Sequence, residues 1–520
     1  MAARTTFYIT TPIYYVNDVP HIGHMYTTLA CDVLARFKRL DGYDVKFLTG
    51  TDEHGQKVDK AARAAGLDPQ AFTDKVSRNF RDLAEAMNFS HDDFIRTTEE
   101  RHFRACQALW TRLAERGHIY SGSYSGWYAV RDEAFYSESE LTPGPDAEKL
   151  APSGAPVEWV EEPSYFFRLS DWQEPLLRFY DENPEFVLPR SRFNEVVSFV
   201  RGGLQDLSIS RTTFKWGIPV PGDADHVMYV WLDALTNYIT GVGYPSTDQG
   251  EFATYWPADV HMVGKDILRF HAVYWPAFLM AAGIAPPQRV FAHGWWTVEG
   301  RKMSKSLGNA IDPMHLVNTY GLDQVRYVML REVPFGNDGD FSHTAVVNRI
   351  NGDLANDLGN LCQRVLSMVA KNCGAAVPTP SGFSASDEEM LAAAHSLLPA
   401  LRAAYDAQAF HEAIDRLWSV IRAANGYVDR QAPWALRKTD PRRMETVLYV
   451  LAEAIRHIAI LLQPIVPDAA QAILDQLAVS PSHRSFKHLG PDHALVAGMA
   501  LPKPEAVFPR YVLDAGAGQG

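Results

Sequence analysis

The order of apolar and polar segments in the first fifty residues constrains the fold most strongly. An apolar run at residues 7–11 precedes a loop with two prolines, and apolar side chains then recur at helical spacing over residues 25–40. A second apolar run covers residues 45–49. Strand, loop, helix and strand in this order form a βαβ unit, which builds a parallel sheet covered by helices. We therefore predict an α/β fold for this part of the chain.

The rest of the chain predicts an interrupted sheet followed by helices. Residues 120–221 carry short aromatic-rich runs and a Pro/Gly-rich stretch, which indicate an insertion. Apolar runs at 227–230, 260–263 and 290–292 predict strands with which the α/β sheet resumes. From about residue 342 a helical bundle is expected, with a first apolar stripe made of Ile350, Leu354, Leu358, Leu361, Val365 and Met368.

Composition excludes several classes of protein. A length of 520 residues predicts three to four domains, and 47% hydrophobic with 21% charged residues is ordinary for a globular chain. A disordered, collagenous or disulfide-stapled chain is excluded. With 49 Lys and Arg against 62 Asp and Glu, the net charge is −13, which argues against an overall basic nucleic-acid coat. A local basic strip remains open, with the candidates Arg326, Arg331, Arg349 and Arg364.

Cysteine usage and targeting signals indicate the compartment. Four cysteines occur in the chain, and no two have the CxxC spacing of a zinc knuckle: Cys31, Cys106, Cys362 and Cys373. So few thiols favour a reducing cytosol. The first residues lack a signal peptide's charged-then-apolar pattern. The longest uncharged run, residues 272–288, is shorter than the roughly 20 residues of a spanning helix. We expect a cytoplasmic protein without a membrane partner.

The first chemical motif is Pro20-His21-Ile22-Gly23-His24, which opens the helix after the first strand. A helix N-terminus offers N–H groups and a positive dipole end to an anion. Gly23 lets a ligand approach the backbone, and the two histidines, three residues apart, can donate to phosphate oxygens. Taken alone, the motif fits two ordinary capping or surface histidines equally well.

The second chemical motif is the segment 301–309, Arg-Lys-Met-Ser-Lys-Ser-Leu-Gly-Asn. Glycines on both sides of it, Gly300 and Gly308, suggest a mobile loop that could bring lysines to a phosphoryl group. Two lysines alone are more often a solvated basic turn.

Together the two motifs resemble the HIGH and KMSKS signatures of the class I aminoacyl-tRNA synthetases. Further segments, over about residues 5–480, resemble the methionyl-tRNA synthetase family: TPIYYVN at 11–17, GTDEHG at 50–55, VWLDA at 230–234, HGWW at 293–296, NGDL at 351–354 and QAPW at 431–434. The resemblance implies an α/β fold: a Rossmann-type parallel-sheet catalytic domain with an inserted connective-peptide domain, and then an α-helical bundle that binds the anticodon. We place the boundaries at 1–119 and 222–298 for the two catalytic halves, 120–221 for the insertion, 299–349 for the KMSKS and stem-contact region, 350–480 for the bundle and 481–520 for a C-terminal extension.

The resemblance implies a two-step ligase reaction. L-Methionine and ATP would form methionyl-adenylate and pyrophosphate, and the methionyl group would pass to the 3′-terminal adenosine of tRNA(Met). The catalytic residues by this match are His21, His24, Lys302 and Lys305. The ATP-binding residues are these four with Gly23, Gly264, Asp266, His293, Gly294, Met303, Ser304 and Ser306, and His271 lies just beyond the Gly264–Asp266 segment. Mg²⁺ is expected with the nucleotide, mostly held by phosphate and water.

The amino-acid pocket is also carried over from the family. Asp52 would face the ammonium group, and the side-chain pocket would be lined by Ile13, Tyr15, Trp231, Ala234, Leu235, Tyr238 and His293. Homocysteine lacks only the methyl group of methionine, and one methylene is worth roughly 1–3 kcal/mol, so editing by cyclisation in the same site is a hypothesis. Without the motifs, Trp231 and Tyr238 fit plain core packing better.

The bundle supplies the expected tRNA contacts. Asn356, Asn360 and Arg364 follow one another at intervals of four, and such side chains can read base edges. Asn360 and Arg364 match the family's anticodon readers, and Trp434 matches its stacking residue. Without the resemblance, a solvated helix face and a core tryptophan would explain these residues.

Two departures from the family carry expectations of their own. Residues 120–221 contain no cysteine, so we expect no structural zinc and instead aromatic packing among Trp127, Tyr128, Phe135 and Trp159. The short stretch after the bundle leaves no room for a dimerising domain, so we expect a monomer. Two other classes remain: a small-molecule nucleotidyltransferase, which leaves KMSKS and the bundle unexplained, and a non-catalytic RNA-binding paralogue, which predicts decayed catalytic loops.

Overall fold

The computed structural model describes residues 5–16, 19–132, 134–145, 148–298, 300–303 and 310–512, with the backbone alone for Tyr124 and Lys302. The chain divides into two compact units. We call them the sheet unit, Thr6–Pro20 with Lys46–His293, and the helical unit, Met1–Thr5 with His21–Val45 and Gly294–Gly520. Each is described by itself.

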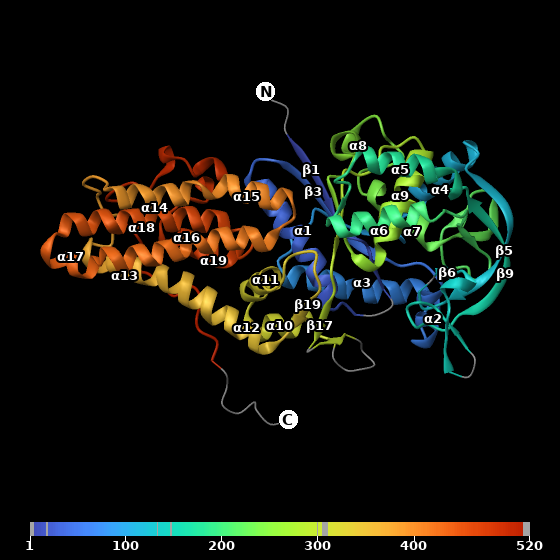
Figure 1. Ribbon diagram of the computed structural model, residues 1–520, viewed down its shortest axis with the longest axis horizontal. Helices are drawn as coiled ribbons and strands as arrows, with labels where there is room; N and C mark the ends of the chain where they lie inside the picture. Colours follow the sequence, from blue (N-terminus) through green and yellow to red (C-terminus); the bar gives the residue numbers. More distant parts are fainter. Residues whose placement is uncertain are drawn as a thin grey trace. The chain divides into compact units, whose positions relative to one another are not determined.

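A seven-stranded sheet organises the sheet unit (Figure 1). The order is β10-β16-β15-β1-β3-β2, with β4 also paired to β3. The bounds are β1 Thr6–Thr10, β2 Tyr14–Tyr15, β3 Asp44–Asp52, β4 Asp93–Arg96, β10 Val187–Leu188, β15 Val260–Gly264 and β16 Val290–His293. The pairs β1–β15, β15–β16, β10–β16, β2–β3 and β3–β4 are parallel, which confirms the predicted parallel sheet. The strand order reverses between β1 and β15, and ligands of such sheets bind beyond the carboxyl ends of the strands at this point.

Helices pack on this sheet and form the hydrophobic core of the unit with it. They are α2 Gln56–Ala64, α3 Pro69–Ala86, α4 Glu100–Glu115, α5 Gln173–Glu182, α6 Arg190–Arg201, α7 Val230–Thr240, α8 Gly250–Tyr255 and α9 Trp275–Ala281. Helix α7 is buried at every position but Trp231, because its sequence VWLDALTNYIT is apolar nearly all round. It packs against α4, whose buried face joins the same core. A helix buried on all sides can hold a ligand pocket rigidly.

The predicted insertion contains antiparallel sheets. Strand β5 (Ile119–Ala129) pairs along its length with β9 (Glu158–Phe167), and β6 (Ala134–Tyr136) and β11 (Leu207–Ser208) complete that sheet. The predicted aromatic packing is confirmed: the ring centroids of Trp127 and Trp159 are 5.2 Å apart, and those of Tyr128 and Phe135 are 4.7 Å apart. Strands β7 (Thr142–Pro143) and β8 (Lys149–Leu150) form a separate pair. Within the same range, β10 pairs with β16 of the main sheet.

One predicted strand was placed in the wrong sheet. The apolar run 227–230 contributes to β14 (Asp223–Met228), which pairs antiparallel with β12 (Ser210–Arg211) and β13 (Pro219–Val220). It does not join the parallel sheet, and Val230 already begins α7. A short apolar run identifies a buried strand, but its partner is chosen by long-range packing.

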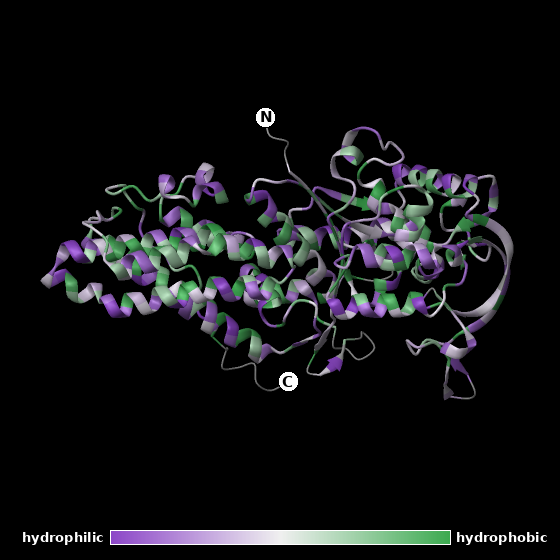
Figure 2. Cartoon of the chain, turned by 45° about the horizontal axis from the view of Figure 1, so that its top comes forward, coloured by the Kyte–Doolittle hydropathy of each residue, from purple (hydrophilic) through white to green (hydrophobic). Residues whose placement is uncertain are grey.

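The helical unit combines α1 (Ile22–Leu40) with a bundle, and in Figure 1 the bundle helices run side by side. Its elements are β17 Trp296–Val298, β18 Arg301–Lys302, α10 Pro313–Tyr320, α11 Leu322–Arg331, β19 Gly339–Phe341, α12 His343–Arg349, a π-helix at Ile350–Gly359, α13 Asn360–Asn372, α14 Ala385–His395, α15 Leu397–Asp406, α16 Phe410–Gln431, α17 Pro433–Thr439, α18 Pro441–Leu462 and α19 Pro467–Gln476. Hydrophobic and hydrophilic residues alternate along these helices (Figure 2), and the predicted stripe is buried from Ile350 to Val365. Helix α18 lies at the centre, in contact with α13, α14, α16, α17 and α19. In the described part of the chain, no helix has the length and apolar character needed to span a membrane.

The predicted basic strip is wrong for Arg326. This residue is fully buried, and its guanidinium donates to the Asp32 carboxylate at 2.7 Å and to the carbonyls of Pro464 and Ile465. Arg331 and Arg349 are also paired with carboxylates of the unit. Basic residues spaced along a sequence can serve as internal ion pairs, which composition does not reveal.

Candidate active site

Several predicted site residues meet at the carboxyl edge of the parallel sheet. Asp52 ends β3, Gly264 ends β15 and His293 ends β16. Gly264 and His293 are register partners, and Tyr15 on β2 is the register partner of Asp52. The sheet thus brings together residues separated by up to 278 positions, at the edge where ligands of such sheets bind.

The segment after β3 fixes the position of Asp52. The Asp52 side chain is buried, and its backbone carbonyl accepts from Val16 N–H at 3.1 Å. The next residue, Glu53, accepts two hydrogen bonds from the Arg96 guanidinium, at 2.7 and 3.0 Å, and one from Thr98 at 2.6 Å. These charge-assisted bonds lock the backbone beside Asp52.

Helix α7 supplies one wall of the predicted pocket. Trp231, Ala234, Leu235 and Tyr238 follow the i, i+3, i+4, i+7 spacing of a single helix face. The Trp231 ring stacks on Phe270 with 3.4 Å between centroids and 8° between planes. Ile13 packs against the core cluster that contains Leu235 and Tyr238. The wall is therefore apolar and aromatic, as expected for a thioether pocket.

Two histidines behind this wall fix the Tyr238 ring. Its hydroxyl donates to Nε2 of His271 at 2.6 Å, because Nδ1 of His271 carries the proton that it donates to the Ile267 carbonyl. The Tyr238 ring also stacks on His261 with centroids 4.0 Å apart. Burial lowers the pKa of His271 to about 4 and lowers that of His261 well below its usual value, so both rings are neutral at pH 7. His271, which follows the Gly264–Asp266 segment, thus orients a residue of the predicted pocket wall.

A buried carboxylate network next to this wall was missed by the sequence analysis. Asp233 on α7 is fully buried and accepts from Nδ1 of His54 at 2.7 Å and from Nε2 of His102 at 2.8 Å. These contacts hold the Asp233 pKa, against the effect of burial, at about 2. Donor atoms of His102, Cys106 and Asp233 lie within 4.8 Å of one another, yet each is engaged in hydrogen bonds. In the sequence, the sign of this network is one acidic residue, Asp233, within an otherwise uncharged segment, VWLDALTNYIT.

The histidines of the first motif cap α1. Nδ1 of His21 accepts from the Gly23 N–H at 3.0 Å, and Nδ1 of His24 accepts from the His21 N–H at 3.1 Å. A Cβ at Gly23 would lie 2.9 Å from Cε1 of His21, so this position needs glycine for the cap itself. The Gly23 N–H is therefore not open to an anion as expected. Since each Nδ1 accepts a hydrogen bond, the neutral rings carry their proton on Nε2, and this atom is the donor that a phosphate would meet.

The remaining predicted nucleotide residues are described in part. A Cβ at Gly264 would lie 2.5 Å from Oδ1 of Asp266 and 3.9 Å from Cε1 of His293, so these three predicted ATP residues are neighbours in the sheet unit. Gly294 faces the backbone of Asn337, where a Cβ would meet the carbonyl oxygen at 2.3 Å. Lys302 lies in β18 and Met303 follows it, while Ser304, Lys305 and Ser306 lie outside the described residues.

Two of the three predicted anticodon residues meet in the helical unit. The Arg364 guanidinium lies 5.7 Å from the centroid of the Trp434 ring and donates to Asp429 at 2.8 Å. Trp434 is 50% exposed, although tryptophan is usually buried. Asn360 is exposed at the start of α13, one turn before Arg364. An exposed indole beside a cation can stack on a base, and the amide one helical turn before that cation can contact a base edge.

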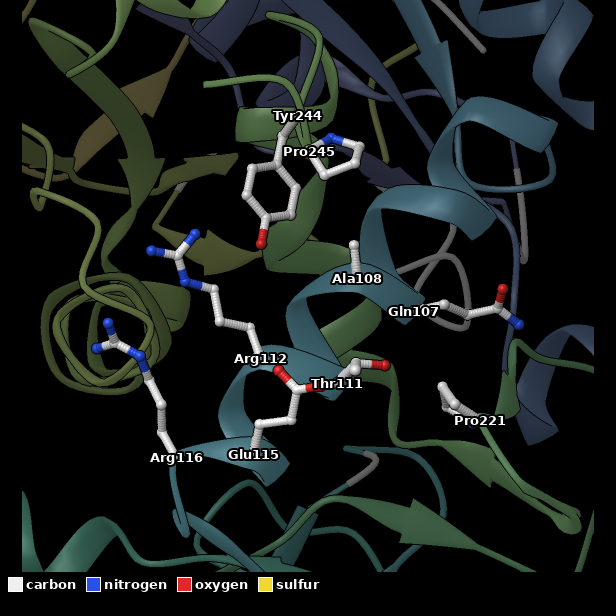
Figure 3. A pocket seen from close by; sticks show the side chains of 9 residues that line it. All are labelled: Gln107, Ala108, Thr111, Arg112, Glu115, Arg116, Pro221, Tyr244 and Pro245. Carbon is white, nitrogen blue, oxygen red and sulfur yellow. The ribbon is translucent and has the colours of Figure 1, made fainter. Parts of the chain in front are cut away.

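A separate hollow lies elsewhere in the sheet unit, on the outer side of α4 (Figure 3). Arg112, Arg116 and Glu115 line it with Gln107, Ala108, Thr111, Pro221, Tyr244 and Pro245. None of the predicted site residues is among them.

A Rossmann-type parallel sheet with polar residues at its carboxyl edge, together with a helical bundle that exposes a tryptophan, fits a class I aminoacyl-tRNA synthetase. Residues 7–366 match the family described as tRNA synthetases class I (M), and residues 377–515 match the anticodon binding domain of methionyl tRNA ligase. Methionine–tRNA ligases of Mesorhizobium japonicum and Brucella suis are 58% and 57% identical, over 99% and 98% of this chain and 99% of each relative. A structure of Mycobacterium tuberculosis methionyl-tRNA synthetase in complex with methionyl-adenylate matches with a TM-score of 0.95 and 54% identity, covering 97% of this chain and 100% of that one. The chain belongs to the methionyl-tRNA synthetase family.

Proposed function

We propose that this chain joins L-methionine to the 3′-terminal adenosine of tRNA(Met) in two steps, through methionyl-adenylate. The observation that carries this function is the full-length match to the M. tuberculosis enzyme in complex with methionyl-adenylate. The residues at the end of β3 and on α7 support the same amino acid, because they combine a buried carboxylate, Asp52, with apolar and aromatic side chains.

In the first step, the methionine carboxylate attacks the α-phosphate of ATP and pyrophosphate leaves. Asp52 would pair with the ammonium group, and the thioether would lie against Trp231 and Tyr238 together with Ile13, Tyr15, Ala234, Leu235 and His293. Sulfur–aromatic contacts are worth roughly 0.3–1.5 kcal/mol each. Because Tyr238 is fixed by His261 and His271, the wall is preorganised for the side chain.

The phosphates would be bound by cations and N–H donors. The Nε2 atoms of His21 and His24, with Lys302 and Lys305, would stabilise the charge that develops on the phosphoryl oxygens. Gly264, Asp266 and Gly294 would bind the adenosine part, with Gly23, Met303, Ser304 and Ser306 in the two motifs. The four catalytic residues include no carboxylate, so Mg²⁺ with the nucleotide would be held mainly by phosphate oxygens and water and would supply further charge neutralisation.

The residues of the insertion do not fit a structural zinc ion. The range 120–221 contains neither cysteine nor histidine, the usual ligands of structural zinc. Packing between β5 and β9, with the Trp127–Trp159 pair, would stabilise this region instead.

In the second step, the helical unit would select the tRNA. Asn360 and Arg364 would read anticodon bases, and Trp434 would stack on one of them. We further propose that the protein acts as a monomer in the cytoplasm.

Aminoacylation of tRNA tests this function. Purified protein, ATP, Mg²⁺ and methionine should charge tRNA(Met), while a transcript with altered anticodon bases should be charged at least about tenfold less efficiently. If neither tRNA is charged, the proposed reaction is contradicted. If both are charged equally, the proposed anticodon selection is contradicted.

A further inference from the structure

Three segments that surround the proposed methionine pocket converge on one carboxylate. Asp233 comes from α7, His54 follows β3, and His102 comes from α4. All three side chains are exposed by 3% or less. His54 and His102 lie 179 and 131 positions from Asp233 in the sequence. The carboxylate therefore joins elements that only the tertiary fold brings together.

The contact with His54 bears directly on Asp52. Asp52, Glu53 and His54 are consecutive, and the segment is anchored at both Glu53 and His54. Arg96 holds the Glu53 carboxylate, and Asp233 holds the His54 ring. The His54 carbonyl also accepts from the Tyr15 hydroxyl at 3.1 Å, which ties a second predicted pocket residue to the same backbone. Loss of the His54 anchor would free the chain on one side of the ammonium-binding carboxylate.

The same carboxylate also lies on α7, the helix that carries the predicted thioether wall. Asp233 lies two residues after Trp231 and directly before Ala234, on α7. Its contact with His102 of α4, and that of His102 Nδ1 with Thr240 at the end of α7, hold this helix at both positions. Asp233 thus fixes the distance between the thioether wall and the Asp52 segment.

The positions of the protons on the two histidines require a carboxylate at position 233. An ionised carboxylate only accepts hydrogen bonds, so Nδ1 of His54 and Nε2 of His102 both carry protons. An asparagine of the same shape would present one N–H₂ group to one of these N–H groups. One ring would then have to turn or change its tautomer, while the volume of the site stays the same.

We infer that Asp233 is a positioning residue for methionine, which sets Asp52 and the α7 wall at the separation that the amino acid requires. This role rests on the proposed function of Asp52 and Trp231. Asp233 acts through His54 and His102 and does not itself contact the substrate.

The test compares Asp233→Asn, His54→Phe and His54→Asn in methionine-dependent ATP–pyrophosphate exchange. H54F removes the N–H donor, whereas the side-chain amide of H54N can replace Nδ1–H. D233N and H54F should raise KM for methionine about 10- to 100-fold, because the loss of one hydrogen bond to a charged group, here that of Asp52 with the ammonium, has an effect of this size. KM for ATP should stay within about twofold of its value in the unmodified protein, and H54N should recover most of the methionine affinity.

A matched control lies in the bundle. Glu453 on α18 is also a buried carboxylate paired with a histidine, His457, and with Arg456, and its pKa is lowered to about 2. Glu453→Gln should lower the melting temperature as D233N does and leave KM for methionine unchanged. This control separates a loss of stability from a loss of positioning.

The outcomes distinguish this role from the function on which it rests. If D52N raises KM for methionine while D233N and H54F leave it within about twofold, Asp233 is structural only and the inference is overturned. If D52N also leaves KM unchanged, the proposed pocket itself is wrong. If D233N does not fold, H54F and H54N decide: a rise in KM for H54F that H54N reverses supports the inference, and equal values for both overturn it.

Discussion

Replacing Trp434 with alanine separates tRNA recognition from amino-acid activation. The indole is half exposed, and the Arg364 guanidinium lies 5.7 Å from the centroid of its ring. An exposed cation–π contact contributes about 0.5–1 kcal/mol and the buried half of the indole about 2–3 kcal/mol, so W434A should lower the free energy of unfolding by no more than about 4 kcal/mol. Stacking of one base on an aromatic side chain contributes about 1–3 kcal/mol. The variant should therefore lose about 5- to 150-fold in kcat/KM for tRNA.

The assay measures aminoacylation over a range of tRNA concentrations, alongside pyrophosphate exchange without tRNA. W434A should raise KM for tRNA and leave exchange unchanged, because exchange requires only methionine and ATP. Trp159→Ala is a matched control, since Trp159 is 54% exposed but lies in the insertion, where it packs on Trp127. Unchanged charging by W434A, or an equal loss in both assays, would refute the assignment of Trp434 to the anticodon.

Three further predictions concern stability and metal content. Gly50→Ala should lower the free energy of unfolding in urea by about 3 kcal/mol or more, because the new Cβ would lie 2.0 Å from the Ile95 carbonyl oxygen across the β3–β4 pair. A loss below about 1 kcal/mol would contradict this close approach. Burial raises the pKa of Asp323 to about 6. The stability that the protonated carboxyl contributes is therefore fully present below the unfolded pKa near 4 and is lost as the pH rises through 6. The free energy of unfolding of Asp323→Asn, relative to that of the unmodified protein, should rise by about 2–3 kcal/mol between pH 4 and 7.5, and a constant difference would contradict this account. Elemental analysis of the purified protein should find no stoichiometric zinc, and a zinc chelator should leave exchange unchanged at saturating Mg²⁺; one tightly bound zinc per chain would contradict the assignment of the insertion.

Local patterns in the sequence predict the framework of the fold. The βαβ unit at the N-terminus, the strands at 260–263 and 290–292 and the helical bundle are confirmed, because hydrophobic period and turn residues are local signals. The structure extends the predicted strands to Asp52, Gly264 and His293, and the parallel sheet brings these residues to one edge. The family resemblance supplied their roles, which remain predictions.

Features that depend on long-range packing could not be predicted. The pairing of β14 with β12 and β13, the burial of Arg326 against Asp32 and the Asp233 network each join segments without a local signature. The capping of α1 by His21 was one of two readings of a short motif, and side-chain geometry was needed to find it. Buried charges are the common element, since a carboxylate or guanidinium in an apolar stretch requires a partner whose position only the fold determines.

Amino-acid-dependent ATP–pyrophosphate exchange tests the central claim most directly. The purified protein is assayed with each of the twenty amino acids, without tRNA, and Lys305→Ala is measured alongside it. Methionine alone should drive strong exchange, and K305A should abolish it. Exchange driven by a different amino acid would contradict the proposed pocket, and exchange with none of the twenty would contradict methionine activation by this chain.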